Sequence, residues 1–263
     1  MMDYEEFKKA FYKQSKINLD LYKEKQMKRR ITSLVEKNGF NSYMAFYWAM
    51  LRDKDLYDTF INYLTINVSE FYRNPGQWEL MEKTIIPMLI KRKGNSENIR
   101  IWSSACSTGD EPYTIVMLLN KFMPLSKIKI IASDIDMGAI RKAEQGIYPD
   151  RSVKDLPKEF LDKYFTCINS SLFKISDEVK KCVDFRQLNL LEDPYPRDMD
   201  LIVCRNVLIY FTEEAKINIY ENFNRSLVQD GILFLGSTEQ IIGSSRYGFK
   251  PIQTFFYQKT HTV

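Results

Sequence analysis

Histidine is almost absent from this sequence, which contains one such residue, His261, among 263. A Ser-His-Asp or Cys-His catalytic group and a histidine metal site each need a histidine inside the fold, so neither is expected. The cysteines form no Cys-x-x-Cys pair, which argues against a zinc module and a disulfide framework: Cys106, Cys167, Cys182 and Cys204. The chemistry should therefore rest on carboxylates, arginines, amides, tyrosines or a bound cofactor, without a metal.

Long hydrophobic runs are also missing. Ala45–Leu51 and Ile85–Ile90 are far shorter than the roughly 20 residues of a membrane-spanning helix. Charged residues begin at Asp3, a pattern unlike that of a signal peptide. The net charge of +4 is too small to indicate nucleic-acid binding. We expect a cytoplasmic protein that neither inserts into a membrane nor binds nucleic acid.

Proline is absent from residues 1–66, and glycine occurs there only at Gly39. Apolar residues recur in this segment at helical spacing, followed by Asn38-Gly39 as a helix stop. They form two groups: Met27, Ile31, Leu34 and Val35, then Tyr43, Phe46, Tyr47 and Met50. The pattern predicts an all-helical N-terminal domain over residues 1–66.

Beyond residue 97, short apolar runs alternate with helical patterns, which predicts a doubly wound α/β sheet over residues 67–263. The expected strands are Ile99–Ser103, Ile128–Ser133, Leu201–Cys204 and Ile232–Leu235, with an antiparallel return at Thr254–Lys259. The expected helices are Glu111–Phe122, Gly138–Gln145 and Glu213–Leu227. The alternation lapses over about residues 148–188, where we expect an inserted β subdomain with strands at Tyr164–Ile168, Leu172–Ile175 and Val183–Leu188.

The first expected strand leads into a loop of small residues, Ser104–Gly109, and then into a helix. Such a loop lets backbone amides and a helix N-terminus approach a ligand. Asp134 directly follows the next strand, where an acidic side chain can bind ribose hydroxyls. Asp136 is the weaker candidate because it lies further from the strand. An ordinary turn with a solvated acidic pair would give the same pattern.

The ligand of this loop is better described as cationic than as a dinucleotide. Gly109 is the loop's single glycine, whereas a pyrophosphate site favours Gly-x-Gly-x-x-Gly. S-adenosylmethionine, with its ammonium and sulfonium groups, suits a neighbouring carboxylate. Glu111 is the candidate, since Asp110 also has a structural explanation as a charge at a helix N-terminus.

Asp200–Phe211 (DLIVCRNVLIYF) carries polar residues to the carboxyl end of another expected strand. Arg205, Asn206 and Tyr210 would face a substrate there, although a turn with Tyr210 in the core is the alternative. No Asn-Pro-Pro-Tyr sequence is present, which argues against methylation of amino groups. Thr65–Arg73 (TINVSEFYR) adds polar residues on a linker that would cross the open end of the sheet, and a solvated linker is its alternative.

Together these segments closely resemble the chemotaxis receptor methyltransferases, the CheR-type protein-glutamate O-methyltransferases. The resemblance runs from about Tyr4 to Gln258 and rests on INVSEFYR, IWSSACSTGDEPYT, IASDID, LNLL, LIVCRNVLIYF and GSTEQI in this order. It implies transfer of a methyl group from S-adenosylmethionine to glutamate side chains of receptor helices, leaving S-adenosylhomocysteine. It places these residues near the cofactor: Asn67, Ser69, Arg73, Glu111, Asp134, Asn189, Leu190, Arg205 and Asn206. It also implies that Arg73 and Tyr210 act beside the transferred methyl group.

The resemblance further implies that the helical domain docks on cytoplasmic receptor helices. Lys25, Lys28 and Arg29 fall on the face of their helix away from the apolar stripe, although a solvated face is the usual reading of such a pattern. In some relatives the β subdomain binds a receptor tail through a Gly-Thr-Gly loop. Cys167–Ser171 contains no glycine, so we expect no tethering, and we expect a monomer.

Three other functions remain possible alternatives on the sequence. An RNA or DNA methyltransferase could use the same sheet, but the mild charge argues against it. A non-enzymatic signalling adaptor could retain the fold and the cofactor. A nicotinamide dehydrogenase fits least, because the loop has a single glycine.

Overall fold

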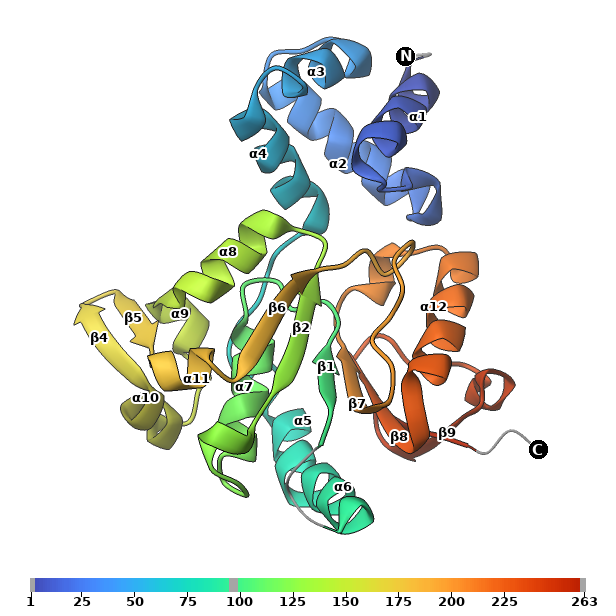
Figure 1. Ribbon diagram of the computed structural model, residues 1–263. Coiled ribbons are helices and arrows are strands. Elements are labelled where there is room, and N and C mark those ends of the chain that lie inside the picture. The colour runs from blue at the N-terminus through green and yellow to red at the C-terminus, as the bar shows by residue number, and fades with distance from the viewer. Residues whose placement is uncertain (1–2, 95–98, 261–263) are drawn as a thin grey trace.

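The computed structural model describes residues 3–94 and 99–260, so His261 lies outside the described residues. An all-helical N-terminal part precedes a domain built on a seven-stranded sheet (Figure 1). The expected fold class, an α/β methyltransferase sheet preceded by a helical domain, is confirmed. Within the two described ranges, no helix is long and apolar enough to cross a membrane.

The helical domain has an aromatic core. Its helices are α1 (Tyr4–Ser15), α2 (Glu24–Lys37), α3 (Tyr43–Met50) and α4 (Lys54–Thr65). Phe7, Phe11, Phe46 and Phe60 are fully buried between them. The rings of Phe11 and Phe60 meet edge to face with centroids 5.0 Å apart, an arrangement that aromatic pairs prefer. The apolar stripes predicted for α2 and α3 are buried in this core, as expected.

The large sheet has the strand order β6-β2-β1-β7-β8-β10-β9. Its strands are β1 (Ile101–Ser103), β2 (Ile130–Asp134), β6 (Val183–Gln187), β7 (Met199–Cys204), β8 (Leu227–Leu235), β9 (Phe249–Gln253) and β10 (Phe256–Lys259). The pairings from β6 to β8 are parallel, and β10 is antiparallel to both β8 and β9. The antiparallel return is therefore confirmed, and β9 is an edge strand that the sequence pattern did not predict.

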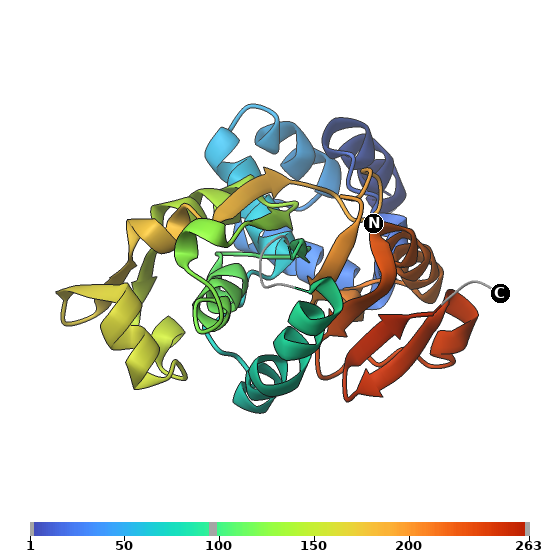
Figure 2. The ribbon, with the colours of Figure 1, turned by 60° about the horizontal axis from the view of Figure 1, so that its bottom comes forward.

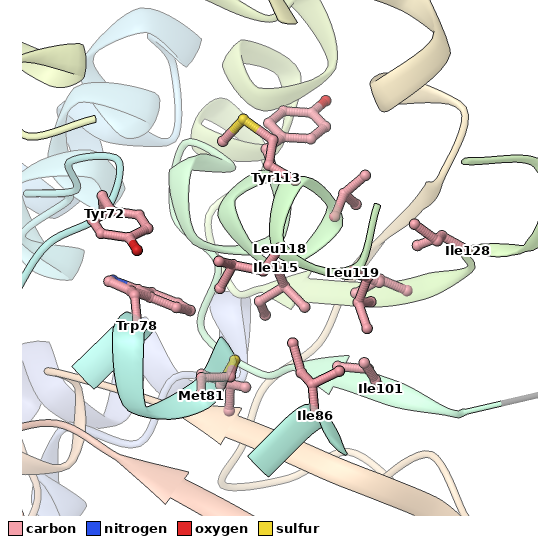
Figure 3. Packing of buried hydrophobic residues seen from close by; sticks show 14 of the residues in the cluster. Tyr72, Trp78, Met81, Ile86, Ile101, Tyr113, Ile115, Leu118, Leu119 and Ile128 are labelled. Atoms are coloured by element: carbon pink, nitrogen blue, oxygen red, sulfur yellow. The ribbon is translucent and has the colours of Figure 1, made fainter. Parts of the chain in front are cut away.

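Helices cover both faces of this sheet, because successive strand residues point to opposite sides. Ile101 packs in the cluster with α5 (Pro75–Leu80), α6 (Ile86–Lys93) and α7 (Asp110–Leu119), as Figure 3 shows. Trp102 packs on the other face with α12 (Glu213–Ser226). The result is a three-layer sandwich with the helical domain above the carboxyl ends of the strands (Figures 1 and 2).

The inserted β subdomain follows α8 (Met137–Gln145) and is smaller than expected. Its sheet has the order β3-β5-β4, with strands Ile147–Pro149, Leu172–Ile175 and Phe165–Asn169. Three short helices accompany it: α9 (Asp150–Val153), α10 (Lys158–Tyr164) and α11 (Asp177–Lys180). Placing Val183–Leu188 in this subdomain was wrong, because β6 pairs in parallel with β2 of the large sheet. An edge strand buries one face only, so its apolar and polar residues alternate like those of an antiparallel strand.

Candidate functional site

A pocket with an empty volume of about 1040 Å³, partly open to solvent, lies at the carboxyl ends of the central strands. The chain passes from β1 to β2 on one side and later returns to β7 on the other, and ligands of open α/β sheets bind at such a reversal. Every residue that the resemblance assigned to cofactor or methyl transfer lines this one pocket: Asn67, Ser69, Arg73, Glu111, Asp134, Asn189, Leu190, Arg205, Asn206 and Tyr210.

The loop after β1 brings Glu111 to the pocket wall. Gly109 immediately precedes α7 and has φ +89, and an added Cβ there would lie 2.8 Å from Cβ of Ala143, so the loop packs closely on α8. One Glu111 oxygen accepts a hydrogen bond from Ser103 Oγ at 2.8 Å, and the other lies 3.6 Å from Arg205 Nη1. Burial raises the pKa of Glu111, while Arg205 and Ser103 oppose the shift. Asp110 is buried but does not line the pocket.

Asp134 ends β2 with its carboxylate at the pocket. Its oxygens accept backbone N–H groups from Ser107 at 2.7 Å and Asp136 at 3.0 Å. Burial is the main reason that its pKa rises to about 6. Asp136 instead caps α8 and accepts a hydrogen bond from Asn67 Nδ2 at 2.6 Å. The two carboxylates thus have different places: Asp134 lines the pocket, and Asp136 fastens the linker to α8.

Arg205 follows β7 and holds the linker against the sheet. Its Nη2 donates to the carbonyl of Arg73 at 2.9 Å and to Gln77 Oε1 at 2.8 Å. The guanidinium lies over the rings of Trp78 and Phe234, 4.8 and 5.0 Å from their centroids. Stacking of this kind suits the planar, weakly hydrated guanidinium. Arg205 is therefore fixed by contacts on several sides beside Glu111.

The next residue, Asn206, has φ +61 and is held by Glu239, a residue to which the sequence reasoning gave no role. The Glu239 carboxylate accepts backbone N–H groups of Asn206 at 2.6 Å, Leu208 at 2.7 Å and Gly236 at 2.9 Å. A Cβ at Gly236 would lie 2.4 Å from this carboxylate. Burial raises the pKa of Glu239, and the donors oppose the shift. Glu239 belongs to the GSTEQI segment, but the sequence does not indicate that its carboxylate binds the backbone of Asn206, 33 residues earlier.

Tyr210 and Arg73 lie in the same pocket although they come from distant segments. Tyr210 ends the short 3-10 helix η4 (Leu208–Tyr210) and is half-buried. Burial raises the pKa of its phenol, so the hydroxyl stays protonated at neutral pH. Arg73 Nη1 donates to the carbonyl of Val68 at 3.1 Å, and Val68 is 64% exposed at the pocket wall. The arrangement places one neutral donor and one cation in reach of a ligand.

Asn189 and Leu190, which follow β6, contribute to the pocket in a different way. Asn189 Nδ2 donates to the carbonyl of Lys16 at 2.9 Å, and its Oδ1 accepts from Leu191 N at 3.0 Å. Its amide is therefore committed to backbone partners and ties the sheet to the helical domain. Leu190 is buried beside it as an apolar part of the wall.

The helical domain itself lines the pocket through Ile17, Tyr22 and Leu64, which no sequence pattern indicated. Lys25, Lys28 and Arg29 lie elsewhere, around a separate surface hollow on α2 that also includes Glu24 and Glu36. The basic face is thus real but interrupted by acidic residues. In the described part of the chain, no group of three or more His, Cys, Asp or Glu side chains could hold a metal ion.

Comparison with known proteins decides the family. Residues 67–256 match the CheR methyltransferase SAM binding domain, and residues 2–65 match the CheR methyltransferase all-alpha domain. The chain belongs to the CheR methyltransferase family. A chemotaxis protein methyltransferase of Listeria innocua is 38% identical over 98% of this chain and 97% of its own length. Chemotaxis protein methyltransferase 2 of Vibrio cholerae is 36% identical over 91% of this chain and 85% of its own.

As a CheR methyltransferase, the chain depends on S-adenosylmethionine, and its pocket residues fit that cofactor. Glu111 and Asp134 present two carboxylates whose pKa values are raised by burial. A cation with hydroxyl donors would stabilise both in their ionised form. The aliphatic surface of Leu190 suits the uncharged part of such a molecule.

Proposed function

We propose that this CheR methyltransferase esterifies glutamate side chains in the cytoplasmic helical domain of chemotaxis receptors. The observation that carries the proposal is the convergence of the linker, β1, β2, β6 and β7 on one pocket. The relatives named as chemotaxis protein methyltransferases support the substrate class. We infer a monomeric cytoplasmic enzyme in which residues 1–66 dock on the receptor and residues 67–263 carry out methyl transfer.

The two acidic residues would hold opposite ends of the cofactor. Asp134, at the end of β2, accepts hydrogen bonds from ribose hydroxyls, as acidic residues do at this place in related folds. Glu111 pairs with the ammonium group. The polar part of the pocket wall comes from Asn67, Ser69 and Asn206, and Leu190 contributes an apolar part.

The acceptor needs no general base, because a glutamate carboxylate with a pKa of about 4.3 is already ionised at neutral pH. When bound, S-adenosylmethionine would supply an electrophilic methyl group to a carboxylate oxygen and leave as S-adenosylhomocysteine. No proton moves in this exchange. Tyr210 donates a hydrogen bond that orients the carboxylate, and Arg73 helps to align it. Positioning then supplies most of the acceleration, aided by exclusion of water.

Receptor docking would use the basic residues of α2. Lys25 and Arg29 are exposed, and Lys28 is partly covered by the ring of Tyr4, 4.9 Å from its centroid. Long cationic side chains at the rim of an interface steer an acidic partner toward it. The neighbouring Glu24 and Glu36 would restrict which acidic surfaces fit.

Two measurements test the proposed function. Calorimetric titration with S-adenosylhomocysteine should show one site with micromolar affinity. Incubation with S-adenosylmethionine labelled on the methyl group should place label on receptor fragments, as an ester that releases methanol in base. Binding without transfer would favour the adaptor, and label on nucleic acid would favour the RNA or DNA methyltransferase. Absence of binding by folded protein would overturn the enzyme assignment.

A further inference from the structure

A short backbone bridge joins the helical domain to the segment that carries Tyr210. Lys23 N donates to the carbonyl of Tyr210 at 2.8 Å, and Thr212 N donates to the carbonyl of Leu21 at 2.9 Å. Tyr22 lies between these bonds as the antiparallel partner of Phe211. This is a two-bond piece of sheet between residues that are far apart in the sequence.

The bridge lies directly beside both functional surfaces. Helix α2, with the basic face, begins at Glu24, immediately after Lys23. The paired side chains, Tyr22 and Phe211, both line the cofactor pocket, and their rings meet edge to face with centroids 5.0 Å apart. A partner pair of this kind has closely spaced side chains, so it fixes the local register of both segments.

In the described part of the chain, the backbone of Tyr210 is held by its own turn, where its N–H donates to the carbonyl of Val207 at 3.2 Å, and by this bridge. The start of its 3-10 turn is fixed by Glu239, which accepts Leu208 N. Its end is fixed by the bond from Lys23. The side chain is half-buried and lies at the pocket, away from the two main cores.

We propose that the bridge is a positioning element: the helical domain sets the place of Tyr210 through the backbone of Lys23. The inference rests on the proposed function, since it assigns Tyr210 a place in methyl transfer. It makes the helical domain part of the reaction site as well as a docking surface. Loss of the bridge should therefore lower turnover while leaving docking and cofactor binding in place.

A matched pair of substitutions isolates the bond from Lys23. Lys23 has φ −59 and Tyr22 has ψ 154, values that a proline and the residue before it adopt without strain. Both Lys23→Pro and Lys23→Ala remove the exposed lysine side chain. Lys23→Pro also removes the backbone N–H, whereas Lys23→Ala keeps that N–H. In steady-state methylation of a receptor fragment, we expect kcat of the proline variant to be about tenfold below that of the alanine variant. The KM for receptor should differ by no more than about twofold between the two variants, and so should the Kd for S-adenosylhomocysteine.

The other bond of the bridge provides a second pair. Thr212 has φ −66 and Phe211 has ψ 155, so proline again fits the backbone. Thr212→Pro and Thr212→Ala both lose the side chain that caps α12, and only the proline variant loses the N–H. The same fall in kcat is expected. If Lys23→Pro does not fold, the two Thr212 variants test the positioning role of the bridge.

The outcomes separate the inference from the proposed function. Equal kcat within each pair, in enzymes that methylate the receptor, would overturn the positioning role. A parallel rise in Kd for S-adenosylhomocysteine in both proline variants would show instead that the bridge only closes the pocket, and it would overturn the inference too. A wild-type enzyme that transfers no methyl group to receptor would contradict the proposed function itself.

Discussion

The carboxyl group of Asp134 is buried, and burial disfavours its ionised form. Its pKa is raised from 3.8 to about 6, so between these values the folded protein binds a proton more tightly than the unfolded chain does. The free energy of unfolding therefore falls as pH rises through this window, and the penalty is fully present above it. Its carboxylate also lines the pocket, so a ligand bound there could stabilise the ionised form.

The pH dependence of cofactor binding follows from this shift. In the proposed site, ribose hydroxyls would stabilise the ionised Asp134, so binding would release a proton below pH 6. The affinity for S-adenosylhomocysteine should rise from about pH 5 to pH 6.5 and then level off. Calorimetry at several pH values measures this slope. It should be smaller in Asp134→Asn, with the remainder due to Glu111, and an unchanged slope would remove Asp134 from the ribose.

At neutral pH, Asp134→Asn should weaken binding of S-adenosylhomocysteine by about 1–3 kcal/mol, because a hydrogen bond to a charged group is lost. The matched control is Asp162→Asn, an exposed position in the inserted subdomain. Titration of both variants at one pH makes the comparison. Equal affinity of the two would mean that the carboxylate does not reach the cofactor.

Tyr210→Phe should lose turnover without losing the cofactor, because the substitution removes only the hydroxyl that we propose orients the acceptor. We expect kcat to fall by about tenfold or more, with the Kd for S-adenosylhomocysteine unchanged. Arg73→Ala should also lose turnover in a folded protein. Single-turnover methylation of a receptor fragment measures both. Full activity in the two variants would end this account of the mechanism.

At the scale of elements, the turn after β7 depends on a buried carboxylate from another loop. Glu239→Gln presents an amide NH₂ to backbone donors, so at least one N–H loses its acceptor. Such a loss costs about 1–3 kcal/mol of stability. Urea unfolding should show it, and kcat should fall because Asn206 and Tyr210 share this turn. Glu214→Gln, at an exposed site on α12, should change neither quantity.

Helix α2 carries the docking prediction. Reversal of Lys25, Lys28 and Arg29 to glutamate should raise the KM for receptor and reverse its dependence on salt, since exposed charges act mainly on encounter and salt would then screen a repulsion. Cofactor affinity should stay as in the wild type, because these residues do not line the cofactor pocket. Loss of receptor methylation together with loss of cofactor binding would indicate misfolding rather than a docking defect.

At the scale of the whole molecule, the inserted subdomain extends from the body without the glycine loop expected of a receptor-tail site (Figure 1). Cys167–Ser171 covers the end of β4 and the turn into β5, and Ile168 is 50% exposed. We expect no tight binding of a receptor C-terminal pentapeptide. Fluorescence titration with a labelled pentapeptide would test this, and saturable binding at low micromolar concentration would contradict it.

Local patterns predicted most of the fold because burial on a helix face or a strand has a fixed period. The stripe of Met27 and Ile31 and the runs that became β1, β2, β7 and β8 are examples. β6 was misplaced because its alternating residues describe an edge strand equally well in either sheet. The strand's partner depends on the path of the chain around the inserted subdomain, which no local pattern records.

The sequence by itself determined the family, the cofactor and the residues on each strand end that line the pocket, because these depend on residue type and order. Only the tertiary structure brought the helical domain into the pocket through Tyr22, placed Glu239 beneath Asn206 and joined Lys23 to Tyr210. These contacts link segments that lie far apart along the chain. In the contacts of Glu239 and Lys23 the partners are backbone groups, which every residue carries, so the identity of the residue cannot reveal them.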